Sequence, residues 1–337
     1  NALAGLINIK SNEQIADESG YFSAKIGDYN SQDISAGYGV KVDNNLSARI
    51  SAHSSTSDGY ITNDHLNRSN TNGFDEKTLK ANLKWEEALS SYKLNLLRVD
   101  TDNGYDAFTI DNTRTTQSDE PGKDKITFTG ASFQTNNLKN NYFTVESNTE
   151  LSKSKSLYSY DYDWMNEGFR GHTGTDFEAF DRDIDKGSFD IRLLSNSNIL
   201  SGSTSWIVGT FLKSYNEDLT QSRIEDGTTT TYTNNYESVS AAIYTELRSN
   251  LSNNTSITYG LRIEEWSSDF NDSNNLIDEH SETLYGGKIS IDSMINENHL
   301  AYASLSRGFK AGGFNSDAAL PSDLIKFDTE YNWSSEL

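Results

Sequence analysis

YASLSRGFKAGGFN, which runs from Tyr302 to Asn315, is a strand pattern that leads into a glycine-rich end. Taken alone it predicts a strand followed by a flexible loop, because glycine often marks a bulge or the end of a strand. It does not predict a phosphate-binding loop, since no lysine followed by serine or threonine closes the glycines and no helix-forming run follows them. The meaning of the stretch therefore depends on the rest of the chain.

The composition narrows the class of protein. The 337 residues carry a net charge of −22, only 34% are hydrophobic, and there is no cysteine. The longest apolar stretch, Ala2–Ile9, is far shorter than the roughly 20 residues of a membrane-spanning helix, which excludes a helical membrane protein. The acidic balance argues against a nucleic-acid partner, and the lack of cysteine excludes disulfide frameworks and thiolate metal sites. With 18 Tyr, 15 Phe and 5 Trp the chain has too many aromatics for ordinary disorder, whereas a polar, aromatic-rich sequence suits a membrane β-barrel.

Apolar and polar residues alternate along almost the whole chain, as they do in strands with one apolar and one polar face. The pattern occurs in residues 34–42, 46–51, 79–85, 239–244 and 256–263. No comparable stretch has helical periodicity. Alternation alone does not distinguish a membrane barrel from a soluble β-sandwich.

The lengths of the connections alternate as well. Short turns are expected at Asp43–Asn45, Glu87–Ser90, Asn136–Asn140, Ser197–Ser203, Ser249–Asn254 and Ile295–Asn298. Long polar connections are expected at Ser55–Glu76, Thr101–Gly122, Met165–Lys186, Tyr215–Asn235 and Ser268–Ser281, with Asp28–Gln32 a short connection on the same side. This alternation places the long loops at one end of the strands, which is the asymmetry of outer-membrane barrels.

For this alternation to hold, Tyr142–Trp164 must be a single strand. At ~3.3 Å per residue it would span about 75 Å, which exceeds the ~42 Å path of a tilted strand through the hydrocarbon core. Its upper end is therefore expected to project above the membrane. Four aromatic residues alternate with polar ones there, and we interpret them as a girdle at the membrane interface with a polar lumen behind it. The four are Tyr158, Tyr160, Tyr162 and Trp164, and burial in a soluble core is the alternative.

Several segments resemble TonB-dependent outer-membrane receptors, in the order that this family would have. The glycine-rich stretch resembles a signature of the family, whose residues here are Arg307, Gly308, Phe309, Lys310, Gly312, Gly313, Phe314 and Asn315. Residues 104–124 resemble an extracellular loop of one subgroup, and residues 189–195 with 206–209, 258–262 and 327–337 resemble barrel strands. Asn1–Ile9 resembles the last strand of the plug domain. Residues 1–19 are therefore expected to end the plug and link it to the barrel, whose N-terminal part is residues 20–337.

The resemblance implies an all-β fold, a transmembrane antiparallel β-barrel with short periplasmic turns and long extracellular loops. If the barrel has 22 strands around a plugged lumen, this chain supplies about fourteen of them and about eight are expected beyond Leu337. No signal peptide is visible at Asn1. The signal peptide, the TonB box and most of the plug are expected before Asn1 in a longer protein.

The function implied by the resemblance is energy-coupled uptake of a scarce solute across the cell outer membrane, such as a ferric siderophore, haem, cobalamin or a glycan. The implied partners are the TonB-ExbB-ExbD complex, the ligand and outer-membrane lipid, and no covalent chemistry or cofactor is involved. A non-specific porin is one alternative, against which the plug-like Asn1–Ile9 counts. A secreted all-β adhesin or carbohydrate-binding module is another, against which the one-sided distribution of long loops counts.

The sequence contains no convincing catalytic or metal site. The five histidines are scattered and lack a zinc-binding motif. Ser152 and Lys155 have the spacing of a serine–lysine nucleophile but lack its partner motifs. The run Asp181–Asp185 lacks the glycine and the closing glutamate of a calcium loop. We interpret it as a solvated acidic loop that enters a strand, with a divalent cation at the level of the lipopolysaccharide as the alternative.

The ligand is expected to contact the Met165–Lys186 loop. The residues of this loop that are expected to contact the ligand are Phe169, Arg170, His172 and Phe177. A mobile, solvated loop without ligand contacts is the alternative for each of them. Arg307 and Lys310 are expected to be rim charges at the strand end rather than ligand residues.

Overall fold

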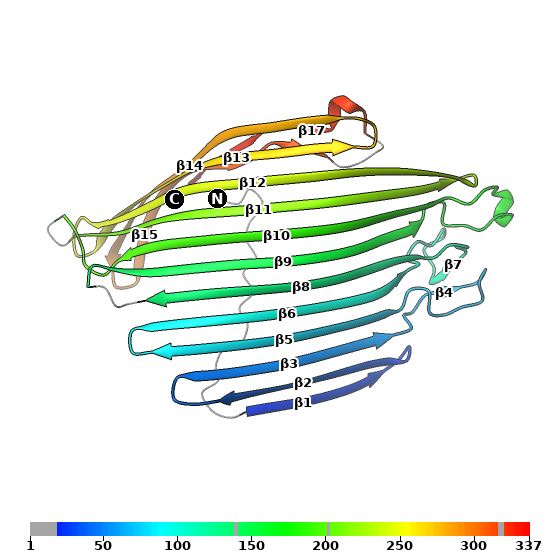
Figure 1. Cartoon of the computed structure of the whole chain (residues 1–337), viewed down its shortest axis with the longest axis horizontal. Helices are drawn as coiled ribbons and strands as arrows, with labels where there is room; N and C mark the ends of the chain where they lie inside the picture. The colour runs from blue at the N-terminus through cyan, green and yellow to red at the C-terminus, as the bar shows by residue number, and fades with distance from the viewer. Residues whose placement is uncertain (1–18, 138–140, 201–202, 316–319) are drawn as a thin grey trace.

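The computed structural model describes residues 19–137, 141–200, 203–315 and 320–337. It contains one 14-stranded antiparallel sheet, in which each strand pairs with the next strand of the sheet along the chain (Figure 1). Its strands are β1 (Ser19–Gly27), β2 (Ser31–Lys41), β3 (Leu46–Ser57), β5 (Phe74–Glu87), β6 (Ser90–Tyr105), β8 (Gly122–Asn137), β9 (Phe143–Asp161), β10 (Phe177–Ser195), β11 (Thr204–Glu225), β12 (Thr228–Asn250), β13 (Thr255–Asp272), β14 (Ile277–Asn296), β15 (His299–Lys310) and β18 (Glu330–Glu336). The prediction of about fourteen antiparallel strands is confirmed.

Short elements occupy some of the connections. Two ladders of two strands each pair β4 (Thr62–Asn63) with β7 (Thr115–Thr116), and β16 (Gly313–Phe314) with β17 (Lys326–Phe327). Single turns of 3-10 helix are η1 (Phe169–Gly171) and η2 (Ser322–Leu324). Within the described ranges, no helix is long and apolar enough to cross a membrane.

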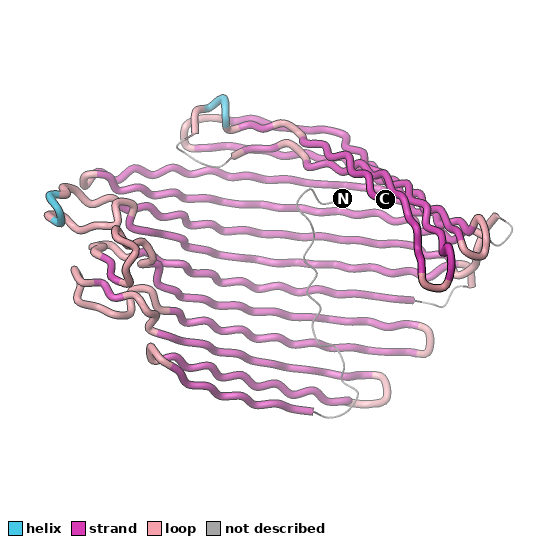
Figure 2. The backbone as a smooth tube through the Cα atoms, turned by 180° about the vertical axis from the view of Figure 1, so that it is seen from behind, coloured by secondary structure: helices cyan, strands magenta, loops and turns pink. Residues whose placement is uncertain are grey.

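The sheet has two edge strands, β1 and β18, and does not close on itself. Seen from behind it is curved, and its C-terminal strands bend over one of its faces (Figure 2). The predicted plug strand Asn1–Ile9 lies outside the described residues, as does part of the predicted turn Asn136–Asn140.

One face of the sheet, here called the outward face, is apolar along the part of the strands next to the short turns. Strand pairing places Leu261 of β13 between Thr245 and Gly287, and two residues further on it places Ile263 between Ile243 and Tyr285. The band recurs around the sheet, and this apolar belt includes Val40, Ile50, Leu79, Leu96, Leu151, Leu212, Val239, Ile243, Leu261, Ile263 and Ile289.

The apolar belt is exposed in this chain. Ile243 is 65% exposed and Leu261 is 51% exposed, and no second sheet among the described residues covers them. An apolar patch of this extent marks a surface that meets lipid or another apolar partner. A soluble sandwich would bury it under a second sheet, so the structure favours a transmembrane barrel wall.

The opposite face, here called the inward face, is polar along the same strands. Arg192 of β10 pairs with Glu146 of β9, with 2.7 Å between Nη2 and Oε2. The hydroxyl of Tyr244 in β12 donates to Asp190 Oδ2 of β10 at 2.9 Å. Alternate residues of each strand therefore separate an apolar surface from a hydrogen-bonded polar one, as in a barrel wall with a polar lumen.

The long connections lie at one end of the sheet, but the strands extend further into two of them than predicted. Tyr215–Asn235 is not a loop, because β11 and β12 remain paired up to a two-residue turn at 226–227. Ser268–Ser281 is also mostly strand, and only residues 273–276 connect β13 to β14. Beyond the apolar belt, water reaches both faces of the sheet, so a strand does not need apolar residues at alternate positions. The apolar/polar alternation by which strands were predicted is therefore absent there.

The remaining long connections agree better with the prediction. Residues 58–73, 106–121 and 162–176 join the strands at this end. β9 covers most of the predicted Tyr142–Trp164 strand, and β10 begins at Phe177, inside the predicted Met165–Lys186 loop. Three real loops therefore gather where β3, β5, β6, β8, β9 and β10 have their long-loop ends (Figure 1).

Candidate functional site at the long-loop end

An aromatic cluster lies on the inward face beneath these three loops. The ring centroid of Tyr158 in β9 is 5.6 Å from that of Tyr160, 5.0 Å from that of Tyr105 in β6 and 6.3 Å from that of Phe180 in β10. The even-numbered residues of β9 share one face with Glu146, whose partner is on the inward face. The prediction of an aromatic girdle at the membrane interface is therefore wrong for Tyr158, Tyr160, Tyr162 and Trp164.

The reason lies in the register of β9. Leu151 belongs to the apolar belt, and the ladder between β9 and β10 continues without a shift from Phe143 to Asp161. Tyr158 is seven positions after Leu151, and because this offset is odd the two side chains lie on opposite faces. The aromatic residues line the inside of the wall above the belt instead of meeting lipid.

Six of the aromatic residues line an open groove of about 630 Å³. They are Phe108, Tyr158, Tyr160, Tyr162, Trp164 and Phe180. Phe108 and Trp164 are stacked, with 5.0 Å between centroids and 11° between ring planes. Tyr162 is 45% exposed and Trp164 is 40% exposed, so the groove offers free aromatic surface to a ligand.

A pair of aspartates holds Trp164 at the edge of the groove. Asp161 Oδ1 accepts hydrogen bonds from the backbone N–H groups of Asp163 and Trp164, at 3.2 and 3.0 Å. Asp163 Oδ1 accepts from the N–H of Met165 at 2.9 Å. These bonds support a left-handed conformation at Trp164, with φ of 64°, which an L-residue adopts only when its surroundings enforce it.

Buried polar contacts tie the 58–73 loop to the 106–121 loop. Asn63 is fully buried, and its side-chain N–H groups donate to Asp106 Oδ2 at 2.9 Å and to the carbonyl oxygen of Ser118 at 2.8 Å. The hydroxyl of Thr116 donates to the same Asp106 oxygen at 2.8 Å. Because unpaired buried polar groups are costly, these bonds favour one arrangement of the loops.

A second link joins the loop above the groove to its neighbour. The side-chain N–H of Asn166 donates to the carbonyl oxygen of Gln117 at 2.8 Å. Asp163 also receives the backbone N–H of Asp176 at 3.0 Å, at the other end of the same loop. The 162–176 loop is therefore fixed at both ends and to the loop beside it.

Two arginines contact the rings of the groove. The guanidinium carbon of Arg223 is 4.7 Å from the ring centroid of Tyr162, and that of Arg182 is 5.2 Å from the centroid of Phe180. Arg182 also pairs with Glu217, at 3.3 Å. Cations on aromatic faces are favourable, by about 0.5–2 kcal/mol depending on exposure, and they bring positive charge to an otherwise acidic chain.

Carboxyl groups near the groove hold their protons more strongly than usual. Burial, together with the nearby Asp163, raises the pKa of Asp161 to about 8. Burial also raises the pKa of Asp119 and of Glu120, the latter with a contribution from the charge of Asp119. Burial and a hydrogen bond to Glu178 raise the pKa of the Tyr160 hydroxyl. At neutral pH this end of the sheet is less negative than its composition suggests.

Three of the four predicted ligand contacts lie in the loop that carries Trp164. Phe169 and Arg170 form the tip, where the Arg170 guanidinium lies 5.3 Å from the Phe169 ring centroid and is exposed. His172 Nε2 is 3.0 Å from Asp163 Oδ2, so this side chain braces the loop. Phe177 is adjacent to the inward-facing Glu178 and lies on the outward face, apart from the groove.

The glycine-rich stretch forms a different site, which is structural. After β15 the chain folds back over the inward face, where Phe314 stacks on Phe270 of β13 with 5.2 Å between centroids. Phe314, Phe270 and Ile325 form a buried cluster. The N–H of Gly312 donates to Glu282 Oε1 at 3.0 Å, and a Cβ there would lie 2.7 Å from a backbone oxygen.

The other residues of the stretch belong to the end of β15 and the turn after it. Gly308 and Phe309 pair with Asn332 and Tyr331 of β18, Gly313 pairs with Phe327, and the N–H of Asn315 donates to the carbonyl oxygen of Ile325. Arg307 lies between the rings of Tyr285 and Tyr331, at 3.9 and 4.1 Å from their centroids. Lys310 pairs with Glu330 at 3.7 Å. Neither cation lines the groove.

The motifs rejected in the sequence do not assemble into sites. Ser152 and Lys155 are three residues apart on β9 and so lie on opposite faces of the sheet. Asp183, in strand β10 and not in a loop, pairs with Lys155 at 2.9 Å. In the described part of the chain, no three His, Asp or Glu residues are grouped so as to hold a metal ion.

Sequence reasoning missed several groove residues. Phe108, Phe180, Arg182 and Arg223 come from a loop and two strands, and no local pattern connects them. The alternation of Phe180 and Arg182 with aspartates was a usable signal, because it marks a strand inside the predicted loop.

Comparison with known proteins identifies the architecture. No protein-family model matches the sequence, and a search among curated proteins finds no match. Solved structures do match: the ferric yersiniabactin uptake receptor FyuA from Yersinia pestis superposes with a TM-score of 0.79 at 13% identity over 95% of this chain and 51% of its own. The alcaligin outer-membrane receptor FauA from Bordetella pertussis gives 0.67 at 11% identity over 96% and 48%, and the copper transporter OprC gives 0.60 at 12% over 87% and 46%. The chain spans about half the length of these proteins.

Proposed function

We propose that the chain is part of a receptor that takes up a scarce solute. The premise is that the described sheet has the fold of the barrel wall of TonB-dependent outer-membrane receptors. Uptake is driven through the TonB-ExbB-ExbD complex. The structures that it resembles include receptors for iron chelates and a copper transporter. Residues 1–19 are assigned to the end of the plug and its linker, and residues 20–337 to the barrel.

The ligand class that the groove fits best is a metal chelate with flat aromatic or conjugated groups. The observation that carries this proposal is the groove of six aromatic side chains with Arg182 and Arg223 stacked on two of its rings. Flat ligand groups stack on aromatic faces, and the two guanidinium groups favour acidic oxygen donors. Phe169 and Arg170 at the loop tip are proposed to close over such a ligand, with His172 as a brace.

The porin alternative requires a freely open lumen, and the adhesin alternative requires no membrane at all. The exposed apolar belt argues against the adhesin. The loops tied together by Asn63 and Asn166 argue for a shaped outer entrance rather than a wide pore.

The test uses the full-length receptor and a panel of ferric chelates, with and without aromatic donor groups. Trp164→Leu combined with Phe180→Leu removes two rings from the groove, and Trp85→Leu on the outward face is the matched control. An aromatic pair contributes about 0.5–1.5 kcal/mol beyond its area, so we expect binding of aromatic chelates to weaken roughly tenfold in the double variant only. Uptake is measured with radioactive iron, with and without a protonophore.

Two results would contradict the proposal. Unchanged affinity of the double variant for every chelate that the wild type binds would exclude the groove as the site. Uptake that persists without the proton-motive force, together with a constitutively open pore in bilayer recordings, would favour the porin.

A further inference from the structure

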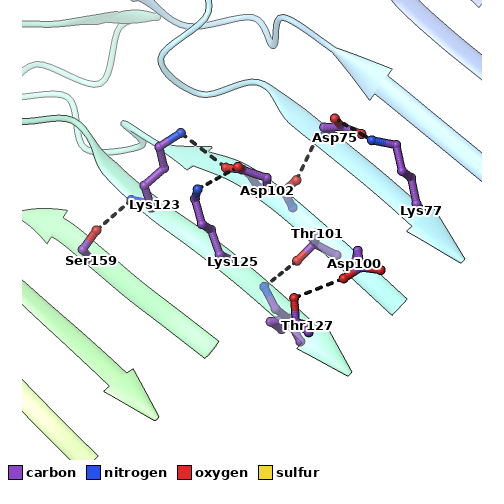
Figure 3. Close-up of polar contacts among 11 residues, drawn as sticks. Asp75, Lys77, Asp100, Thr101, Asp102, Lys123, Lys125, Thr127 and Ser159 are labelled. Carbon is purple, nitrogen blue, oxygen red and sulfur yellow. Dashed lines mark hydrogen bonds and ion pairs between the residues drawn. The ribbon is translucent and has the colours of Figure 1, made fainter. Parts of the chain in front are cut away.

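A band of charged side chains lies on the outward face directly above the apolar belt. Six cations from β5, β6, β8 and β9 form what we call the basic sector: Lys77, Arg98, Lys123, Lys125, Lys153 and Lys155. Figure 3 shows part of it, with Asp102 between Lys123 and Lys125 at 3.4 and 2.7 Å.

The register shows that these cations share a face with the belt. Arg98 lies opposite Leu79 of the belt on one side and Thr129 on the other, and Thr129 lies opposite Lys153. Lys153 is two residues from Leu151, which also belongs to the belt. The basic sector therefore continues the lipid-facing surface toward the long loops.

The height of the sector matches the edge of a membrane. A strand tilted by about 45° gains ~2.3 Å of height per residue. Arg98 is eight residues from the short-turn end of β6 and Lys123 is fourteen from that end of β8, which places them at about 19 and 33 Å. The apolar band of such barrels is ≈ 25 Å tall, so the cations bracket its upper edge.

The charge of the sector is unusual for this chain. On the outward face above the belt, its strands carry four acids, Asp75, Asp100, Asp102 and Asp161, against six cations, although the whole chain has a net charge of −22. The outward face of β11–β14 at the same level has acids and no Lys or Arg among its described residues. Those acids are Asp218, Glu237, Glu265, Asp269 and Glu279.

The ion pairs within the sector leave its cations available. Their side chains are 40–64% exposed, and exposed pairs of this kind contribute little to stability. A phosphate can therefore replace an aspartate as the partner of a lysine at small cost. The aspartates of β10, such as Asp183 and Asp185, hold Lys153 and Lys155 at the border of the sector.

A groove of about 810 Å³ adjoins the sector on its lower side. Leu79, Leu96 and Leu151 of the belt line it together with Ala131, and Arg98 and Lys153 line it on the side of the sector. Asp185 and Glu237 also belong to its lining, and Asp185 is already paired with Lys153. The small side chains of Ala81 and Ala131 and the absence of one at Gly187 leave this space open. An apolar groove with cations along one edge has the polarity of a phosphorylated lipid.

We propose that the basic sector and this groove bind a phosphorylated lipid of the outer leaflet, with its phosphates on the cations and its acyl chain in the groove. The inference rests on the barrel orientation in the proposed function but not on the transported ligand. The acidic sector of β11–β14 would repel the same phosphates, so the lipid occupies one side of the wall.

The test measures lipid binding to the full-length receptor in detergent by native mass spectrometry. The probes are phosphatidic acid, diacylglycerol with the same acyl chains, and inorganic phosphate. The variant is Lys123→Gln, Lys125→Gln and Lys153→Gln together. The control is Lys80→Gln, Lys84→Gln and Lys93→Gln, which removes three inward-facing cations from β5 and β6. Folding of each variant is checked by heat modifiability on gels.

We expect the wild type to prefer phosphatidic acid to diacylglycerol and to inorganic phosphate. Each basic side chain near an anionic lipid surface contributes about fivefold in affinity, so the triple variant is expected to lose roughly a hundredfold while the control keeps wild-type affinity. Equal binding of phosphatidic acid and diacylglycerol, or equal loss in the control, would overturn the proposal. If inorganic phosphate bound as tightly as phosphatidic acid, the ligand of the basic sector would be a soluble anion and not a lipid, which would also overturn the proposal. Chelate binding, measured on the same samples, reports separately on the transport site.

Discussion

Replacing Leu261 by arginine in the full-length receptor tests which face of the sheet meets lipid. Leu261 is six residues from the short-turn end of β13, which corresponds to a height of about 14 Å in a tilted strand. This is close to the middle of a ≈ 25 Å apolar band, where an arginine on the lipid face costs ≈ 2–4 kcal/mol. The side chain is flanked on the same face by Thr245 and Gly287, neither of which can pair with the new charge.

Two control variants separate the effect of the face from the effect of a new charge. Glu246→Arg lies on the inward face beside Gly260, the chain neighbour of Leu261, and should change the free energy of unfolding by less than about 0.5 kcal/mol, as most surface substitutions do. Glu265→Arg lies on the outward face four residues above Leu261, where the expected cost falls to ≈ 0–1 kcal/mol. The free energy is measured by denaturant titration of the receptor in lipid vesicles. Equal destabilisation by Leu261→Arg and Glu246→Arg would refute the assignment of the two faces.

Three further predictions concern the long-loop end. Asp161 has a raised pKa of about 8, so between about pH 4 and pH 8 the native state keeps a proton that the unfolded chain has released. The loop therefore loses stability as the pH rises through this range. Hydrogen exchange in residues 162–176 should become faster over the same range, and Asp161→Asn should remove this pH dependence. Asn63→Ala removes the buried donor to Asp106 and should destabilise the loop cluster by about 1–3 kcal/mol; limited proteolysis that is no faster than in the wild type would contradict this. Phe314→Ala removes the ring stacked on Phe270 and should cost about 3–5 kcal/mol locally, with faster exchange in residues 311–315 and 320–329 and little change in the rest of the sheet.

The strands could be predicted from sequence where lipid imposes a pattern on them. In β13 the residues from Ile257 to Ile263 alternate because one face meets the membrane and the other the lumen. Above the belt, the Thr-rich start of β12 carries no such pattern, although it pairs with β11 along its whole length. The two predicted loops that proved to be strands both lie in this water-exposed part.

The groove could not be predicted because its residues meet only through the fold. Phe108 lies in the loop between β6 and β8, and it stacks on Trp164, which lies in the loop between β9 and β10. Trp164 takes its position from backbone hydrogen bonds to Asp161, which a pattern of residue types does not reveal. The sequence also did not show on which face of β9 the aromatic residues lie, because alternation indicates that the two faces differ but not which of them is inside the barrel.

The grouping of Tyr158 with Trp164 can be tested without any ligand, because the sequence contains no cysteine. A bimane label is attached to Tyr158→Cys or to Leu157→Cys in a full-length receptor that has no other cysteine. Tyr158 and Trp164 line the same groove, whereas Leu157 lies on the opposite face of β9. Tryptophan quenches bimane only at short range, so the label at Tyr158→Cys should be dim and should brighten when Trp164→Phe is added. The label at Leu157→Cys should not respond to Trp164→Phe. If instead the Leu157→Cys label brightened and the Tyr158→Cys label did not, Trp164 would lie on the side of Leu157 and would not share a groove with Tyr158.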